Sequence, residues 1–234
     1  MDRARYQCID RIVETARLLG DLAEQCVFVG GAATGLLITD PANPDVRPTL
    51  DVDVIVEVAK RSDYYRFEDD LRARGFQNDM DVICRWHHDP IILDVLPTDP
   101  DILGFANRWY GAAVAHAQTV EVDGIELRVV TPAYFLATKM EAFHGRGERD
   151  FMASHDMEDF IALLDGRLEI VTDVEAADAE IRGYLAQCMS DLLTNDEFQD
   201  ALPGHLPGDA ASQQRAPIII KRMRDIAQFG EKAP

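Results

Sequence analysis

The chain has 234 residues, 47% of them hydrophobic, which is enough for one large domain or a domain with a helical extension. Its 42 acidic and 23 basic residues give a formal net charge of −19, which argues against broad, non-specific nucleic-acid binding because such binding needs a basic surface. No long uncharged apolar run predicts a membrane helix, and the first residues lack the apolar segment of a signal peptide. We therefore expect a cytoplasmic protein with no membrane partner and four reduced cysteines.

The beginning of the chain predicts a helix, a buried strand, a glycine turn and a second helix. Apolar residues recur at helical spacing over 2–24, and 27–29 is a short apolar run typical of a buried strand. Gly30 and Gly31 follow and predict a tight turn before a helix at 32–38. Glycines at this place let a phosphate approach the backbone, and the N–H groups that open the helix would face it.

Two aspartates lie on the next predicted strand, at 50–56. Because side chains alternate along a strand, Asp51 and Asp53 should share one face. Carboxylates at positions i and i+2 suit a hard divalent cation, and a third carboxylate would complete such a site. Asp94, inside the apolar strand expected at 91–96, is the best candidate, because a buried acid is costly unless it is paired or metal-bound.

Between these acidic strands we expect a helix at 60–74 and a strand at 82–86. The strand is expected to form a hairpin with the Asp94 strand, through a polar turn at 87–90. His87 and His88 in that turn could suggest a metal, but adjacent turn residues rarely converge on one ion, so we favour a polar turn.

The next segment, 103–110, is aromatic, and the sequence leaves open whether it stacks a base or packs as a loop onto the sheet. Strands are expected at 114–122 and 125–130, because the Asp123-Gly124 pair between them is a strong signal for a two-residue hairpin. The sheet should therefore be mixed, in an α/β (α+β) fold.

From Thr131 onward the chain is expected to be helical. Thr131 suits the N-cap of a helix with Pro132 at its first position, running to about His144, and Ser154 suits the N-cap of a second helix to about Leu164. Lys139 should share one face of the first helix with Ala142 and Arg146. Further helices are expected at 172–193, 195–202 and 218–224, with a Pro/Gly loop at 203–212. We place a core domain at 1–130 and a helical region at 131–234 that completes the active site.

Two motifs resemble those of a known superfamily. Gly30-Gly31 followed by Asp51-x-Asp53 resembles the signature of the DNA polymerase β-like nucleotidyltransferases. Lys139-x-x-Ala142-x-x-x-Arg146, followed by Asp156-x-x-Asp159, is similar to the second signature of the AbiEii/AbiGii toxin-like nucleotidyltransferases of type IV toxin–antitoxin systems. The fold this implies is a mixed-sheet nucleotidyltransferase core with a helical C-terminal part.

The resemblance implies roles for the motif residues. Asp51, Asp53 and Asp94 would hold Mg²⁺ or Mn²⁺, and Gly30 and Gly31 would hold a nucleoside triphosphate together with Lys139 and Arg146. Asp156 would act as a base or orient Lys139. These catalytic, metal-binding and nucleotide-binding residues are predictions from sequence.

The reaction implied is transfer of a nucleoside monophosphate from the triphosphate to an acceptor hydroxyl, with RNA, such as a tRNA end, as the acceptor. A cognate antitoxin would be a partner. Two alternatives stay open: transfer to a small molecule of the aminoglycoside kind, and a non-catalytic nucleotide-binding module of the same fold.

Overall fold

A computed structural model of the chain describes residues 3–43, 46–58, 60–145 and 150–230. It divides into two compact units, which are described separately. The first is built from Arg3–Leu36 and Arg47–Thr131, and the second from Leu37–Val46 and the residues from Pro132 onward. The chain passes from the first unit to the second at Thr131-Pro132, where the sequence becomes helical in pattern. No sequence pattern indicates that Leu37–Val46 belongs to the second unit.

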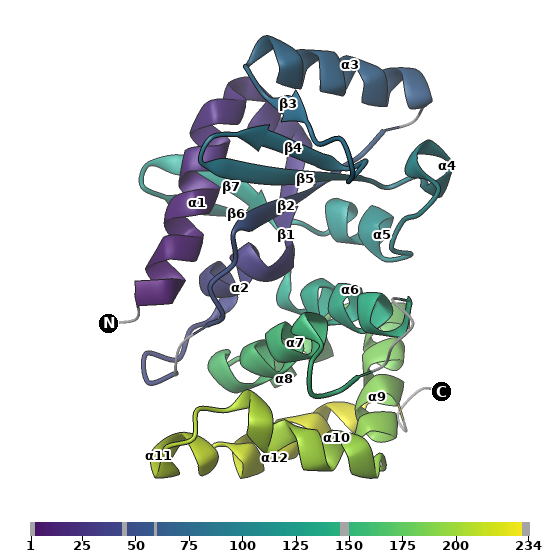
Figure 1. Ribbon diagram of the computed structural model, residues 1–234. Coiled ribbons are helices and arrows are strands. Elements are labelled where there is room, and N and C mark those ends of the chain that lie inside the picture. The colour runs from purple at the N-terminus through teal and green to yellow at the C-terminus, as the bar shows by residue number, and fades with distance from the viewer. Residues whose placement is uncertain (1–2, 44–45, 59, 146–149, 231–234) are drawn as a thin grey trace. The chain divides into compact units, whose positions relative to one another are not determined.

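The first unit is organised around a sheet that has seven strands in the described residues, in the order β3-β4-β5-β2-β1-β7-β6 (Figure 1). The strands are β1 (Cys26–Val29), β2 (Asp51–Val56), β3 (Gln77–Asn78), β4 (Arg85–His88), β5 (Ile91–Pro97), β6 (Gln118–Val122) and β7 (Ile125–Val129). β1 is antiparallel to β2 but parallel to β7, and β2 is parallel to β5. The expected α/β fold with a mixed sheet is therefore confirmed.

Burial follows position in the sheet. All four residues of β1 are apolar and buried, as a strand covered on both faces requires. In β2, Val52 and Val54 are buried while Asp51 and Asp53 are half-buried, so the acids lie on the less covered face at the start of that strand. β6, at the edge, has no buried residue.

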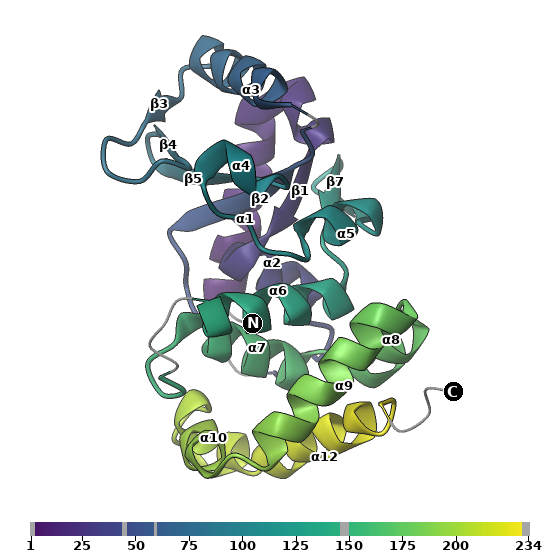
Figure 2. The ribbon, with the colours of Figure 1, turned by 90° about the vertical axis from the view of Figure 1, so that its right-hand side faces the viewer.

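Helices pack around this sheet (Figure 2). They are α1 (Arg3–Leu19), α2 (Gly30–Leu37), α3 (Arg61–Ala73), α4 (Pro100–Leu103) and α5 (Tyr110–Ala115). α1 contacts β2, β5 and β7, and a 3₁₀ turn at Gly20–Gln25 continues it into β1. α2 begins at Gly30 itself, not after the glycine pair, so both glycines belong to the helix.

Two expectations for this unit are wrong. His87 and His88 lie in β4 instead of in a turn, because the hairpin to β5 turns at Asp89-Pro90, whose peptide bond is cis. The strand before the Asp123-Gly124 turn begins at Gln118 and not at 114, because the preceding residues complete α5. The turn itself is confirmed, with both residues at positive φ.

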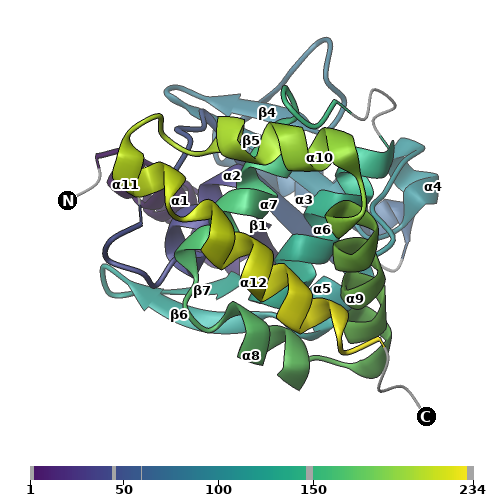
Figure 3. The same ribbon diagram turned by 90° about the horizontal axis from the view of Figure 1, so that it is seen from below.

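The second unit contains helices and no strand in its described residues. None of the helices described anywhere in the chain is long and apolar enough to cross a membrane. Its helices are α6 (Pro132–Gly145), α7 (His155–Gly166), α8 (Ile170–Ala176), α9 (Ala179–Leu193), α10 (Asp196–Ala201), α11 (Ala210–Gln213) and α12 (Ala216–Ala227). α12 lies against α9, and also contacts α7 and α8 (Figure 3). The start of α6 at Pro132 is as expected, and the Ser154 hydroxyl accepts a hydrogen bond from the Met157 N–H at the start of α7.

The expected helix at 172–193 is instead two helices. α8 ends at Ala176, and Ala177 after it is extended. α9 begins after Asp178, which receives a hydrogen bond from the Tyr134 hydroxyl (3.4 Å). The Arg182 guanidinium donates to the carbonyls of Glu175 and Ala177, which satisfies backbone groups at the end of α8. A side chain from the next helix thus stabilises a break that apolar spacing alone does not reveal.

Arg215 joins three parts of the second unit. Its Nε donates to both carboxylate oxygens of Asp165 in α7, at 2.7 and 2.8 Å, and its Nη2 donates to Asp40 at 2.7 Å. The Asp165 side chain is almost fully buried. A buried carboxylate of this kind needs its cation, so Arg215 holds the segment Leu37–Val46 on the helices.

We expect Arg215→Met to lower the free energy of unfolding by about 3–5 kcal/mol, because the buried Asp165 carboxylate loses the cation that is hydrogen-bonded to it. The measurement is urea unfolding followed by circular dichroism. Arg224→Met, on the exposed side of α12, is the matched control and should cost less than about 1 kcal/mol. Equal effects of the two substitutions would contradict this role of Arg215.

Candidate functional site in the first unit

The register of the sheet aligns acidic and basic side chains in one row. Asp53 in β2 is paired with Asp94 in β5, and Asp94 is paired with Arg85 in β4. Registered residues of neighbouring strands point to the same face, and Asp51, two residues before Asp53, points there too. We call Arg85, Asp94, Asp53 and Asp51 the acidic row. The three aspartates predicted from the sequence therefore share one face.

The row lies beside the start of α2. Val29, the last residue of β1, is paired with Asp53, and Gly30 opens the helix with φ +73°. A Cβ added to Gly30 would lie only 1.9 Å from Asp53 Oδ2, so the Asp53 carboxylate packs directly against the glycine backbone. Gly30 is thus required for two reasons: its backbone conformation and the closeness of the carboxylate. A negative charge at a helix N-terminus is also favoured by the helix dipole.

Arg85 contacts two of the three aspartates in the row. Its Nε donates to Asp94 Oδ1 and its Nη2 to Asp94 Oδ2, both at 2.8 Å, in a two-point ion pair. The same Nη2 donates to Asp51 Oδ2 at 3.1 Å. Sequence reasoning missed Arg85. Pairing the two strands of the expected hairpin residue by residue would have placed Arg85 opposite Asp94.

The environment of the row changes the pKa of its groups. Burial acts to raise the pKa of Asp51, but the Thr49 hydroxyl at 2.6 Å, a backbone N–H and the charge of Arg85 outweigh it, so that pKa is lowered. Burial, together with the negative charge of Asp94, raises the pKa of the Cys84 thiol to about 11. Hydrogen bonds to Asp94 raise the pKa of Arg85 further above its normal value. At neutral pH Asp51 and Arg85 are thus charged and Cys84 is a neutral thiol.

In this arrangement Arg85 competes with a divalent cation for two of the three predicted aspartates. Three carboxylates on one face are the hard oxygen donors that Mg²⁺ prefers. However, Arg85 bonds both oxygens of Asp94 and one of Asp51, and the described residues contain no group of three His, Cys, Asp or Glu side chains that could hold a metal ion. The metal-binding role of Asp51, Asp53 and Asp94 stays a prediction.

The other predicted site residues lie in the second unit. Lys139 in α6 donates to Asp159 at 2.6 Å and to Asp156 at 3.3 Å, both in α7. All three residues are buried, with 8% of Lys139, 7% of Asp156 and 3% of Asp159 exposed. The expectation that Asp156 lies beside Lys139 fits this geometry, while Asp159 was not assigned a role. Its spacing from Asp156, three residues on one helix, would have placed both carboxylates on the same face.

One further predicted residue, Arg146, lies outside the described residues.

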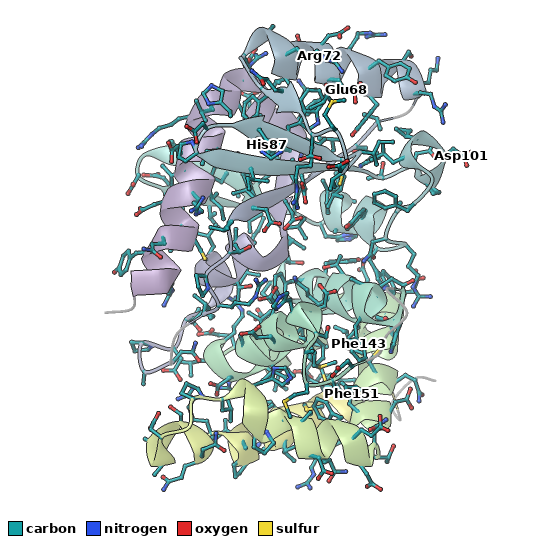
Figure 4. All side chains as sticks on the ribbon, viewed as in Figure 1. Glu68, Arg72, His87, Asp101, Phe143 and Phe151 are labelled. Atoms are coloured by element: carbon teal, nitrogen blue, oxygen red, sulfur yellow. The ribbon has the colours of Figure 1, made fainter. Side chains whose placement is uncertain are left out.

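The second unit also contains a cavity of about 280 Å³ that no sequence pattern indicates. Phe143 and Phe151, whose ring centroids are 4.9 Å apart, form part of its lining (Figure 4), and Asp191 and Glu197 add carboxylates. The cavity lining includes none of the predicted site residues.

No family model matches the chain, and no curated protein matches its sequence. Solved structures do match. An antigenic nucleotidyltransferase-like protein from Paracoccidioides brasiliensis is 18% identical over 82% of this chain and 91% of its own, with a TM-score of 0.46. A putative nucleotidyltransferase from H. pylori is 12% identical over 97% of both chains, with a TM-score of 0.47. JHP933 from Helicobacter pylori is 12% identical over 97% of this chain and 94% of its own, with a TM-score of 0.49. The identities are below 25% and the TM-scores below 0.5, so these likenesses assign no function to this chain.

We expect Gly30→Ala to destabilise the protein more than Gly124→Ala, which is a matched control. Both glycines have nearly the same φ, +73° and +74°, but a Cβ at Gly124 meets nothing within 4 Å. Gly124→Ala should therefore cost only the left-handed backbone strain, about 1–2 kcal/mol. Gly30→Ala should cost about 1–3 kcal/mol more, because Asp53 must move. Urea unfolding checks this, and equal losses would show that Asp53 does not press on Gly30.

Lys139→Met should lower the free energy of unfolding by about 3–5 kcal/mol, because two buried carboxylates lose their cation. Lys221→Met, an exposed lysine in a helix of the same unit, should cost less than about 1 kcal/mol. Thermal and urea unfolding of both variants provide the measurement. A fully stable Lys139→Met protein would mean that the ion pairs with Asp156 and Asp159 contribute nothing to folding.

Proposed function

We propose that this chain is a nucleotidyltransferase, which transfers a nucleoside monophosphate from a nucleoside triphosphate to an acceptor hydroxyl. The observation that supports the proposal is the acidic row: Asp51, Asp53 and Asp94 share one face beside the glycine-opened start of α2. A helix N-terminus offers N–H groups to phosphate, and the carboxylates lie next to it. This is the arrangement that the Gly-Gly and Asp-x-Asp resemblance leads us to expect.

The reaction proposed is an in-line displacement at the α-phosphorus. The acceptor oxygen bonds to phosphorus while the bond to the pyrophosphate oxygen breaks, and pyrophosphate leaves. Such a reaction depends mostly on positioning and on electrostatic stabilisation. In this chain, the N–H groups at Gly30 and Gly31 would bind phosphate, and Asp53 would be held in place by its contact with Gly30. Mg²⁺ or Mn²⁺, when bound, would neutralise charge on the phosphates.

RNA is the acceptor that we propose first, in particular a tRNA end, and a cognate antitoxin is the proposed partner. Both follow from the AbiEii/AbiGii resemblance of the Lys139 and Asp156 motif. The net charge of −19 supports a second candidate, a cationic small molecule of the aminoglycoside kind. Salt separates them: RNA binding through many phosphates should weaken steeply as salt rises, and binding of a small cation should weaken less.

The experiment incubates the protein with Mg²⁺, total cellular RNA and each of the four α-labelled nucleoside triphosphates in turn. We expect label to move into RNA with the wild type and to fall at least on the order of 10²-fold with Asp53→Asn. Asp123→Asn is the matched control, because it makes the same chemical change on an exposed turn, where asparagine tolerates the positive φ.

Each result has a definite meaning. Label in RNA from the wild type and Asp123→Asn, but not from Asp53→Asn, would support the transferase and identify the nucleotide. Equal labelling by Asp53→Asn would overturn the site. Labelling of an aminoglycoside instead of RNA would favour the small-molecule transferase. Nucleotide binding with no transfer to either acceptor would favour the non-catalytic module.

A further inference from the structure

The guanidinium of Arg85 is held as a fork on Asp94. Its Nε–H donates to Asp94 Oδ1 and one Nη2–H donates to Asp94 Oδ2, in two parallel hydrogen bonds of 2.8 Å. The Asp94 side chain is 11% exposed and the Arg85 side chain 27%. A planar two-point pair that is largely shielded from water is both strong and directional. Asp94 therefore fixes where the Arg85 guanidinium lies.

This pairing places a positive charge where a third metal ligand was expected. A cation bound to Asp94 would have to displace Arg85 from both carboxylate oxygens, or lie within a few ångströms of the guanidinium. Arg85 cannot give up its charge to make room, because a guanidinium is not deprotonated in proteins.

Arg85 also retains unused hydrogen-bonding capacity. Its Nε–H and the two Nη2–H groups donate to Asp94 and Asp51, while Nη1 donates to none of the residues that the structure describes. The guanidinium lies next to Asp51, in the same row as Asp53, which packs against Gly30 at the start of α2, where we propose that phosphates bind. Arginine is the side chain best suited to hold a phosphate oxygen while another face of the fork holds a carboxylate.

We infer that Asp94 is a positioning residue for Arg85 and not a cation ligand, and that Arg85 binds a phosphate oxygen of the nucleoside triphosphate through Nη1. The inference rests on the proposed function and refines it, because it replaces the third predicted metal ligand with an anion-binding pair. Asp94 thereby acts on the substrate only through Arg85.

A double-mutant cycle with Arg85→Gln and Asp94→Asn tests whether the two residues act as one unit. Binding of α,β-methylene ATP, GTP, CTP and UTP in Mg²⁺ is measured by calorimetry, and the analogue that binds the wild type is used throughout. Each single variant should lower analogue affinity about tenfold, and the double variant should bind no more weakly than Arg85→Gln alone. A cation ligand would instead make the two losses add.

Direct titration with Mn²⁺ gives the second readout. Asp94→Asn should bind Mn²⁺ within about threefold of the wild type, whereas Asp53→Asn should bind at least about tenfold more weakly.

Arg85→Lys keeps the charge without the fork and should recover part of the analogue affinity. Arg72→Gln is the control arginine: it pairs with Glu68 and lies over the Trp86 ring on the same unit, and its loss should leave analogue affinity unchanged (Figure 4).

Folding of each variant is checked by circular dichroism. The double variant keeps the test usable if a single variant unfolds, because it replaces the ion pair by two neutral amides. Its analogue affinity, compared with that of Arg85→Lys, then decides the assignment, and affinity equal to the wild type would overturn it.

The outcomes separate this inference from the proposed function. Loss of Mn²⁺ binding in Asp94→Asn to the same degree as in Asp53→Asn would overturn the inference and leave the transferase proposal standing. Coupled loss of analogue binding, with no label moving to any acceptor, would support the inference and overturn the transferase. A wild type that binds neither analogue nor Mn²⁺ would overturn both.

Discussion

The alignment of β2 with β5 is the constraint on which the candidate site depends. Parallel pairing sets Asp53 opposite Asp94, and the β4–β5 hairpin then sets Arg85 on the same row. A slip of one residue between these strands would turn Asp94 to the opposite face and bury a different side of β5. Val52 and Leu93, which are paired next to the acids, oppose such a slip because they must stay in the core. The site is therefore a consequence of core packing.

Charge pairing follows one pattern in three places. Arg85 is shared by Asp51 and Asp94, Lys139 by Asp156 and Asp159, and Arg215 by Asp40 and Asp165. In each case one cation meets two carboxylates, at least one of which is buried. A buried acid is tolerated only if it is paired, and an acidic chain has few cations to spare. Sharing a cation satisfies both requirements, and it explains why a cluster of acids in this sequence need not indicate a metal.

Much of the fold could be predicted from local chemistry. Ser154 caps α7 and Asp123-Gly124 forms a hairpin because each signal acts within a few residues. The break between α8 and α9 could not be predicted, because it depends on Arg182 reaching back to the end of α8. Alternation predicts that Asp51 and Asp53 share one face, and Asp94 stands out as an acid inside an apolar strand. Neither signal identifies Arg85, because its role requires knowing which strand pairs with which. Contacts between elements that are distant in sequence, such as Arg85 with Asp94 and Arg182 with the end of α8, are therefore what the sequence alone does not reveal.

Arg85 and Lys139 differ in whether they can bind another anion while paired with their aspartates. A lysine ammonium has three donors on one atom, and in Lys139 that atom lies between two carboxylates in a buried place. An arginine has five donors spread over three nitrogens, so one edge can bind a carboxylate while another binds a different anion. Arg85 has its anchored edge on Asp94 and lies on a partly exposed face. If a single cation of this chain joins structure to substrate, the chemistry of the guanidinium favours Arg85.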